Sequence, residues 1–225
     1  MGRKEEIAVA DEVRFGTFLD VAFVDPIATL TDELLSYKLP RADTVNTTAR
    51  ECGLAGALCL LWVVFLESAI MRVRHDTETT TGERRVLSWI AGFDPPSQLV
   101  EKLTEVFILR DAVTHNHLWE VAGGTDRGRY AEVIAKRLVE ISGDAKYGKI
   151  VDKETGLTPV LHLHVIPTRV DRTDVKKVLS VVWETMQFLR KEDDDFDCSV
   201  AMLNIAFSGA LVVLKEFKQQ FDSAI

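Results

Sequence analysis

The feature that most constrains the fold is an uncharged apolar run of fifteen residues, Cys52 to Leu66, inside a helical pattern that extends from about residue 44 to residue 73. A helix that is apolar on every side must be buried in a protein centre or cross a membrane. A membrane span needs roughly 20 apolar residues, whereas this run contains Gly53 and Gly56 and ends at Glu67. We therefore predict a central buried helix and no membrane segment.

Most of the remaining chain also shows helical spacing. An all-α fold class, mainly a helical bundle, is predicted, with residues 1–225 forming a single domain. The expected helices besides the central one are 13–37, 97–121, 128–142 and two C-terminal helices within 172–223, namely 172–191 and 198–221. Two alternating segments flank a polar turn that contains Gly156, which predicts a small β-hairpin insertion around 147–168.

Composition limits the classes of function. The formal net charge of -8 argues against a protein that coats nucleic acid non-specifically, because such binding rests on many Lys and Arg contacts. A basic focus at one site remains compatible with local RNA chemistry. The three cysteines, Cys52, Cys59 and Cys198, show no ligand-like spacing, so we expect free thiols. The charged amino terminus lacks the features of a secretory signal, and a cytoplasmic location is expected.

A charged patch, Arg110 to His117, interrupts the helix predicted for residues 97–121. Arg110 occupies the next position of an apolar stripe formed by Leu99, Leu103 and Val106. At about 100° per residue, His117 shares the face of Arg110, whereas His115 lies about 140° away, on the face of Asp111. A charge on a core-facing stripe needs a partner, water or a cleft. One interpretation is an internal ion pair of Arg110 with Glu67 or Glu105.

The other interpretation comes from a motif. Arg110-Asp111-x-x-x-His115 resembles the Arg, polar residue, three variable residues, His signature of HEPN-domain proteins. The setting is similar too, since the motif lies late in a long helix and a long apolar helix precedes it. The resemblance covers roughly residues 44–142, with the flanking helices and the hairpin as elaborations. Members of this family are α-helical, and many are metal-independent ribonucleases of toxin, abortive-infection or CRISPR-associated systems.

The resemblance implies a role for each residue of the motif. His115 would be the general acid or base, Arg110 would hold the scissile phosphate, and Asp111 would orient or polarise. Helix geometry favours His117 beside Arg110, whereas the family spacing favours His115, and we choose His115. Asn116 and His117 are then candidate substrate contacts, with His117 either an auxiliary phosphate contact or, equally, a helix-face histidine near the carboxyl-terminal turn. Cleavage by the neighbouring 2′-hydroxyl would leave a cyclic phosphate and a 5′-hydroxyl, with no metal and no cofactor. The implied partners are RNA, a second copy that completes a composite site, and an antitoxin or a nucleotidyltransferase.

Two alternatives stay open. The chain could be a non-catalytic HEPN-like helical module that binds a nucleotide or a protein, with Arg110 and His115 in a structural or ligand role. Separately, His162 and His164 lie two residues apart on a predicted strand and would point to the same side, which suits a metal. Without a clear third ligand, an ordinary exposed strand face is the preferred interpretation of that pair, and we predict no metal site.

Overall fold

The computed structural model describes residues 19–38, 48–76, 86–114, 150–152, 155–192 and 204–225. These residues are mostly helical, with one two-stranded antiparallel sheet, which confirms the predicted class. The elements are α1 (Leu19–Ser36), α2 (Ala49–Asp76), α3 (Val86–Ala91), α4 (Ser97–Thr114), the 3-10 turn η2 (Pro167–Arg169), α6 (Arg172–Glu192), β1 (Asn204–Phe207), β2 (Ala210–Val213) and α8 (Leu214–Ala224).

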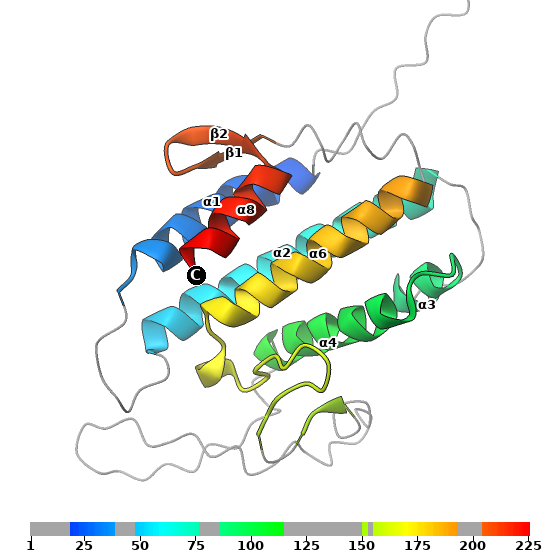
Figure 1. The fold of residues 1–225 in the computed structure, drawn as a ribbon, viewed down its shortest axis with the longest axis horizontal. Coiled ribbons are helices and arrows are strands. Elements are labelled where there is room, and N and C mark those ends of the chain that lie inside the picture. Colours follow the sequence, from blue (N-terminus) through cyan, green and yellow to red (C-terminus); the bar gives the residue numbers. More distant parts are fainter. Residues whose placement is uncertain (1–18, 39–47, 77–85, 115–149, 153–154, 193–203) are drawn as a thin grey trace, which may run out of the picture.

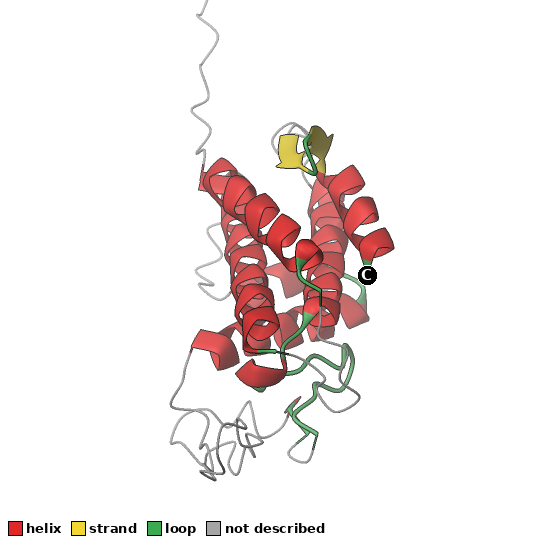
Figure 2. Ribbon diagram, turned by 90° about the vertical axis from the view of Figure 1, so that its left-hand side faces the viewer, coloured by secondary structure: helices red, strands yellow, loops and turns green. Residues whose placement is uncertain are grey.

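Helix α2 lies at the centre of the bundle, as its composition predicts. Figure 1 shows α2 and α6 side by side along the long axis, with α1 and α8 on one side and α4 with α3 on the other. Figure 2, turned by 90°, shows the helices packed as a bundle with the hairpin at one end. Trp62 of α2 is buried and packs its ring edge-on against that of Phe65, with 5.6 Å between ring centroids. It also packs in a tilted arrangement against Phe217 of α8, at 5.8 Å. The apolar residues of α2 therefore contact several elements of the bundle at once.

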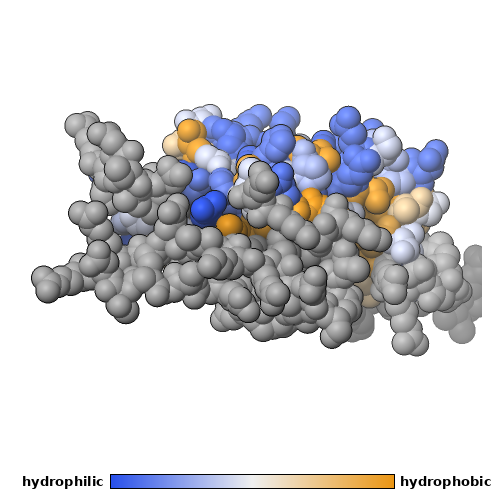
Figure 3. Space-filling view, turned by 90° about the horizontal axis from the view of Figure 1, so that it is seen from below, coloured by the Kyte–Doolittle hydropathy of each residue, from blue (hydrophilic) through white to orange (hydrophobic). Residues whose placement is uncertain are grey.

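The same helix bears on the question of a membrane span. Within the described ranges, Ala49–Arg74 is the one stretch long and apolar enough to cross a membrane by length and composition. However, 56% of its most apolar window is buried against the rest of the protein. This burial fits a core helix. Seen from below, the described surface mixes hydrophilic residues with smaller apolar areas (Figure 3).

The hairpin predicted around 147–168 is wrong in its position. Of that segment the structure describes residues 150–152 and 155–168, and they contain no strand. Residues 156–165 make only a few antiparallel contacts: an isolated bridge between Leu157 and His164, and bonds from the N–H groups of Thr158 and Val165 to the carbonyl oxygens of Leu163 and Gly156, at 3.1 and 3.0 Å. Two physical causes break the alternation. First, His162 adopts a positive φ of 51°. Second, the backbone N–H groups of Val160 and Leu161, which would otherwise join a strand ladder, donate to the buried Glu105 carboxylate, both at 2.8 Å.

The observed hairpin lies in the region predicted as the last helix, 198–221, so the first part of that helix is also wrong. Strands β1 and β2 pair in register from Asn204 with Val213 to Phe207 with Ala210. The two residues of the turn, Ser208 and Gly209, both have positive φ, at 51° and 79°. That geometry matches a type I′ turn, whose twist suits two-residue hairpins. Helix α8 begins only after it, at Leu214.

The other helices agree with the predictions within the described residues. Helices α2, α4 and α6 begin at residues 49, 97 and 172, close to the predicted starts. Helix α1 occupies most of the predicted 13–37, and its residues 19–36 are described. The predicted helix 128–142 and the predicted continuation of α4 to residue 121 lie outside the described residues.

Candidate active site

Arg110 lies on the last turns of α4, where the apolar stripe predicted its position. Leu99, Leu103 and Val106 are fully buried, whereas the Arg110 side chain keeps 27% of its surface exposed. Its Nη1 donates a hydrogen bond to Oε1 of Glu67, on the facing helix α2. The internal ion pair with Glu67 that the sequence offered as one interpretation of Arg110 is therefore present within a single protomer.

Asp111 provides the second carboxylate. Its Oδ1 accepts a hydrogen bond from Nε of Arg110 at 2.9 Å and lies 2.8 Å from Nη2. The Asp111 side chain is 14% exposed, so this pair is partly shielded from water. The Phe107 ring lies beneath the guanidinium, 5.1 Å from ring centroid to Cζ. Asp111, predicted to orient His115, here fixes the orientation of Arg110.

The electrostatics of this cluster keep Arg110 charged. Burial by itself lowers the pKa of Arg110, but hydrogen bonds and charge interactions with Glu67 and Asp111 outweigh burial, and the pKa is raised. A guanidinium carries five N–H donors in a planar fork. Nη1 and Nη2 each hold a second N–H beyond the contacts described above. An anion could therefore reach Arg110 only through those remaining donors, against two neighbouring carboxylates.

The end of α4 is held by contacts of its own. The Thr114 hydroxyl lies 3.0 Å from the carbonyl oxygen of Arg110 and 3.1 Å from that of Asp111. On another face of α4, Ile108 and Ala112 pack in a small buried cluster with Val151 and Val165 of the following loop. His115, Asn116 and His117, the predicted acid or base and substrate contacts, lie outside the described residues.

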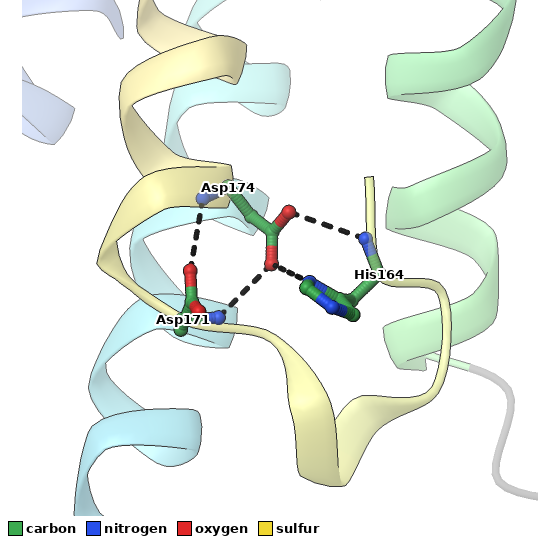
Figure 4. Close-up of side chains that lie close together, drawn as sticks. All are labelled: His164, Asp171 and Asp174. Carbon is green, nitrogen blue, oxygen red and sulfur yellow. Dashed lines mark hydrogen bonds and ion pairs between the residues drawn. The ribbon is translucent and has the colours of Figure 1, made fainter. Parts of the chain in front are cut away.

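A second cluster of titratable residues lies at the amino end of α6 (Figure 4). The Asp174 carboxylate is fully buried and accepts the backbone N–H of His164 at 3.2 Å and that of Asp171 at 3.0 Å. Nδ1 of the His164 ring lies 3.0 Å from Oδ2 of Asp174. Asp171 accepts the N–H groups of Thr173 and Asp174 and thereby caps the helix.

The contacts of His164 shift its titration. The hydrogen bond to Asp174 raises the pKa of His164, burial opposes it, and the charges of Asp174 and Asp171 add to the increase, while Lys177 lowers it. The contact with the buried acid therefore stabilises the charged form of His164 relative to its neutral form. This ion pair, together with the bond from the backbone N–H of His164, fastens the loop of residues 155–166 to α6.

The same three side chains are the candidate metal ligands in the described part of the chain. One ligand atom each of His164, Asp171 and Asp174 lies within 4.8 Å of the others. A nitrogen and two carboxylates suit zinc or a similar transition metal. Both Asp174 oxygens, however, already accept hydrogen bonds, and the Lys177 ammonium lies 3.8 Å from Oδ1. The present contacts serve capping and loop attachment, and they disfavour an added cation.

His162 does not join that cluster. Its side chain is exposed, and its carbonyl oxygen accepts a hydrogen bond from the Lys177 ammonium at 2.7 Å. The predicted strand that would align the two histidines is not formed in residues 155–166, and the candidate ligand cluster contains His164 without His162. Sequence reasoning missed Asp171 and Asp174. Their signal was an Asp-x-x-Asp spacing at the start of an amphipathic helix, with Asp171 directly before α6 and Asp174 in its first turn, the pattern of a helix N-cap followed by an acid.

Another buried acid, Glu51, has a structural partner in Arg172. Glu51, 1% exposed, accepts bonds from Nε and Nη2 of Arg172 at 2.7 and 2.6 Å. Cys52 and Cys59 form no disulfide, as predicted, and the Cys52 thiol donates a hydrogen bond to the carbonyl oxygen of Thr168; Cys198 lies outside the described residues. Burial, followed by the charges of Asp174 and Asp171, raises the pKa of Cys59 well above its usual value, which disfavours the nucleophilic thiolate.

Comparison with known proteins adds no relative: no family model, no curated protein and no solved structure matches the chain.

Proposed function

We propose that the protein is a metal-independent endoribonuclease of HEPN type, with Arg110 and His115 as its catalytic pair. The observation that carries the proposal is the setting of Arg110. It is the first residue of the Arg110-Asp111-x-x-x-His115 motif, and it lies near the end of α4 with 27% of its side chain exposed, charged and with N–H donors beyond those that bond to Glu67 and Asp111. A rigidly held arginine suits the binding of a phosphate, because its fork matches two phosphate oxygens.

The proposed reaction needs proton transfer and charge stabilisation. His115 in its neutral form accepts the proton of the ribose 2′-hydroxyl, or in its charged form donates a proton to the leaving 5′-oxygen. The 2′-oxygen bonds to phosphorus while the bond to the 5′-oxygen breaks, which leaves a cyclic phosphate. Arg110 stabilises the charge that develops on the phosphoryl oxygens. Asn116 and His117 are proposed substrate contacts, and Asp111 keeps Arg110 in place.

A homodimer is part of the proposal. A single copy of the motif provides one histidine and one arginine, whereas cleavage needs both a proton acceptor and a proton donor. Two copies of His115 in a shared groove would provide both. An antitoxin or a nucleotidyltransferase partner, and a cytoplasmic defence or toxin-antitoxin setting, belong to the same proposal.

The test is cleavage of single-stranded RNA by the purified protein in EDTA. We expect cleavage by the wild type and a loss of at least about 100-fold in Arg110→Ala and in His115→Ala. Matched controls are Arg50→Ala and His162→Ala. The Arg50 side chain is 60% exposed and pairs with Glu33 away from the motif, and His162 is an exposed histidine. Both controls should cut RNA at the wild-type rate.

A second candidate function is a non-catalytic helical module. The observation that favours it is that Glu67 and Asp111 already satisfy part of the Arg110 fork without any ligand. In that case the wild type leaves RNA intact, and the Arg110→Ala variant loses stability and nothing else. Thermal unfolding of Arg110→Ala, measured beside the cleavage assay, separates the two functions.

A further inference from the structure

The contact between α2 and α4 points to an additional residue of the proposed site. We infer that Glu67 is a positioning residue, which holds the Arg110 guanidinium in the orientation that the transition state requires. This inference rests on the proposed ribonuclease function. It concerns how the arginine is held, and Glu67 itself need not touch the RNA.

The reason lies in where the two carboxylates come from. Asp111 follows Arg110 directly on α4, so its contacts restrain the guanidinium only relative to its own helix. Glu67 belongs to α2, the central helix, and its bond to Nη1 ties the arginine to the core of the protein. The two helices also approach closely about three turns earlier along α2, since a Cβ added to Gly56 would lie 3.6 Å from Cγ1 of Val113 on α4. The position of Arg110 is thereby set by the packing of two helices.

The charge of Glu67 makes this role distinguishable from simple binding. A carboxylate beside the phosphate-binding arginine repels the substrate, so it weakens binding of RNA in the ground state. A residue that weakens binding but fixes geometry contributes to turnover. Removal of Glu67 should therefore shift affinity and turnover in opposite directions. A residue important only for folding would reduce both.

The experiment compares Glu67→Ala, Glu67→Gln and Glu67→Asp with the wild type. Turnover is measured on single-stranded RNA in EDTA, and affinity on a 2′-O-methyl RNA of the same sequence, which lacks the attacking hydroxyl. In Glu67→Ala we expect kcat to fall about 10- to 100-fold, since a small misplacement of a catalytic group has effects of that size. The Kd for 2′-O-methyl RNA should fall about three- to tenfold, because a nearby like charge is removed.

The conservative variants separate geometry from charge. The amide oxygen of Glu67→Gln still accepts a hydrogen bond from Nη1, so kcat should stay within about threefold of the wild type while binding tightens as in alanine. Glu67→Asp keeps the charge but withdraws it by one methylene, so kcat should fall without a gain in affinity. Glu67→Asp and Glu67→Gln keep the test decisive should Glu67→Ala fail to fold.

The matched control is Glu33→Ala, which removes the acid of another arginine pair, Arg50 with Glu33, between α1 and α2. It should change neither kcat nor Kd. Unchanged or increased kcat in Glu67→Ala, with active wild type, overturns the positioning role and leaves the proposed function standing. Parallel loss of kcat and affinity in Glu67→Asp also overturns it. An inactive wild type instead removes the proposed function, and the inference with it.

Discussion

Arg110 shows how far single residues can be predicted from spacing alone. Its place on the stripe of Leu99, Leu103 and Val106 follows from helical periodicity, and so does its need for a partner. Glu67 could be named because it ends the uncharged run of the central helix. The bond between Arg110 and Asp111 could not be predicted, because side chains adjacent on a helix point about 100° apart and meet only in particular rotamers.

The His164 and Asp174 pair could not be predicted either, because a buried acid at the start of one helix meets a histidine of an irregular loop. This pair predicts how the stability of the protein depends on pH. The pKa of His164 is raised above its ordinary value of 6.5, chiefly by the hydrogen bond to Asp174. A raised pKa in the folded state means that the folded state binds the proton more tightly than the unfolded state does. The pair therefore makes its full contribution to the free energy of unfolding below about pH 6.5, and this contribution is lost as pH rises through the folded-state pKa.

We therefore expect the free energy of unfolding of the wild type to decline, relative to that of His164→Gln, as pH rises above 6.5. Urea denaturation at a series of pH values measures this difference, and an NMR titration of the His164 ring gives its pKa directly. His162→Ala is the control, because that side chain is exposed. A His164 pKa at or below the ordinary value would contradict the account.

At the scale of elements, sequence periodicity located α1, α2, α4 and α6, but it misplaced the strands and predicted a helix where β1 and β2 lie. Residues 149–152 and 160–166 alternate as strands do, but the acceptor of the backbone N–H groups of Val160 and Leu161 is Glu105, a distant residue on α4. The observed hairpin had a local signal, the Ser208-Gly209 pair between two short apolar segments. It was obscured because residues 198–221 also fit a helical period.

Two glycines give a paired prediction at this scale. Gly209 has a φ of +79°, a backbone conformation that residues with a side chain rarely adopt, and a Cβ there would meet nothing within 4 Å. Gly209→Ala should therefore lower the free energy of unfolding by about 1 kcal/mol through backbone strain alone. Gly53 lies in α2 with open space around its Cβ position, so Gly53→Ala should stabilise by about 0.5 to 1 kcal/mol. Chemical denaturation of both variants measures the change in the free energy of unfolding, which should have opposite signs. Equal changes in the two variants would refute the turn assignment at Gly209.

At the scale of the whole molecule, apolar pattern accounts for the bundle, and ion pairs between distant segments account for its arrangement. Arg172, at the start of α6, bonds to Glu51 of α2 through two nitrogens and to the carbonyl oxygen of Tyr37, just after α1, at 3.0 Å. Composition predicted the central helix and the helical class. It could not predict which acid meets which base, because those partners lie 121 residues apart in the chain.

The bonds of Arg172 to Glu51 and to the carbonyl oxygen of Tyr37 form a clamp between α6, α2 and the end of α1, and this clamp should contribute to stability. Arg172→Ala leaves the carboxylate of Glu51, 1% exposed, without its main partner, and breaking a buried pair in this way costs about 3 to 5 kcal/mol. Arg50→Ala, which breaks an exposed pair, should cost less than about 1 kcal/mol. Urea denaturation of the two variants measures the contrast, and a similar small cost in both would show that the clamp does not hold the three helices.

The central claim concerns Arg110 and His115 as a ribonuclease pair. The most direct measurement is the rate of cleavage of single-stranded RNA in EDTA by the wild type, Arg110→Ala and His115→Ala, with folding of each checked by circular dichroism. The account predicts cleavage by the wild type, products that end in a cyclic phosphate, and a loss of at least about 100-fold in both variants. Cleavage retained by both folded variants, or an inactive wild type, would contradict it.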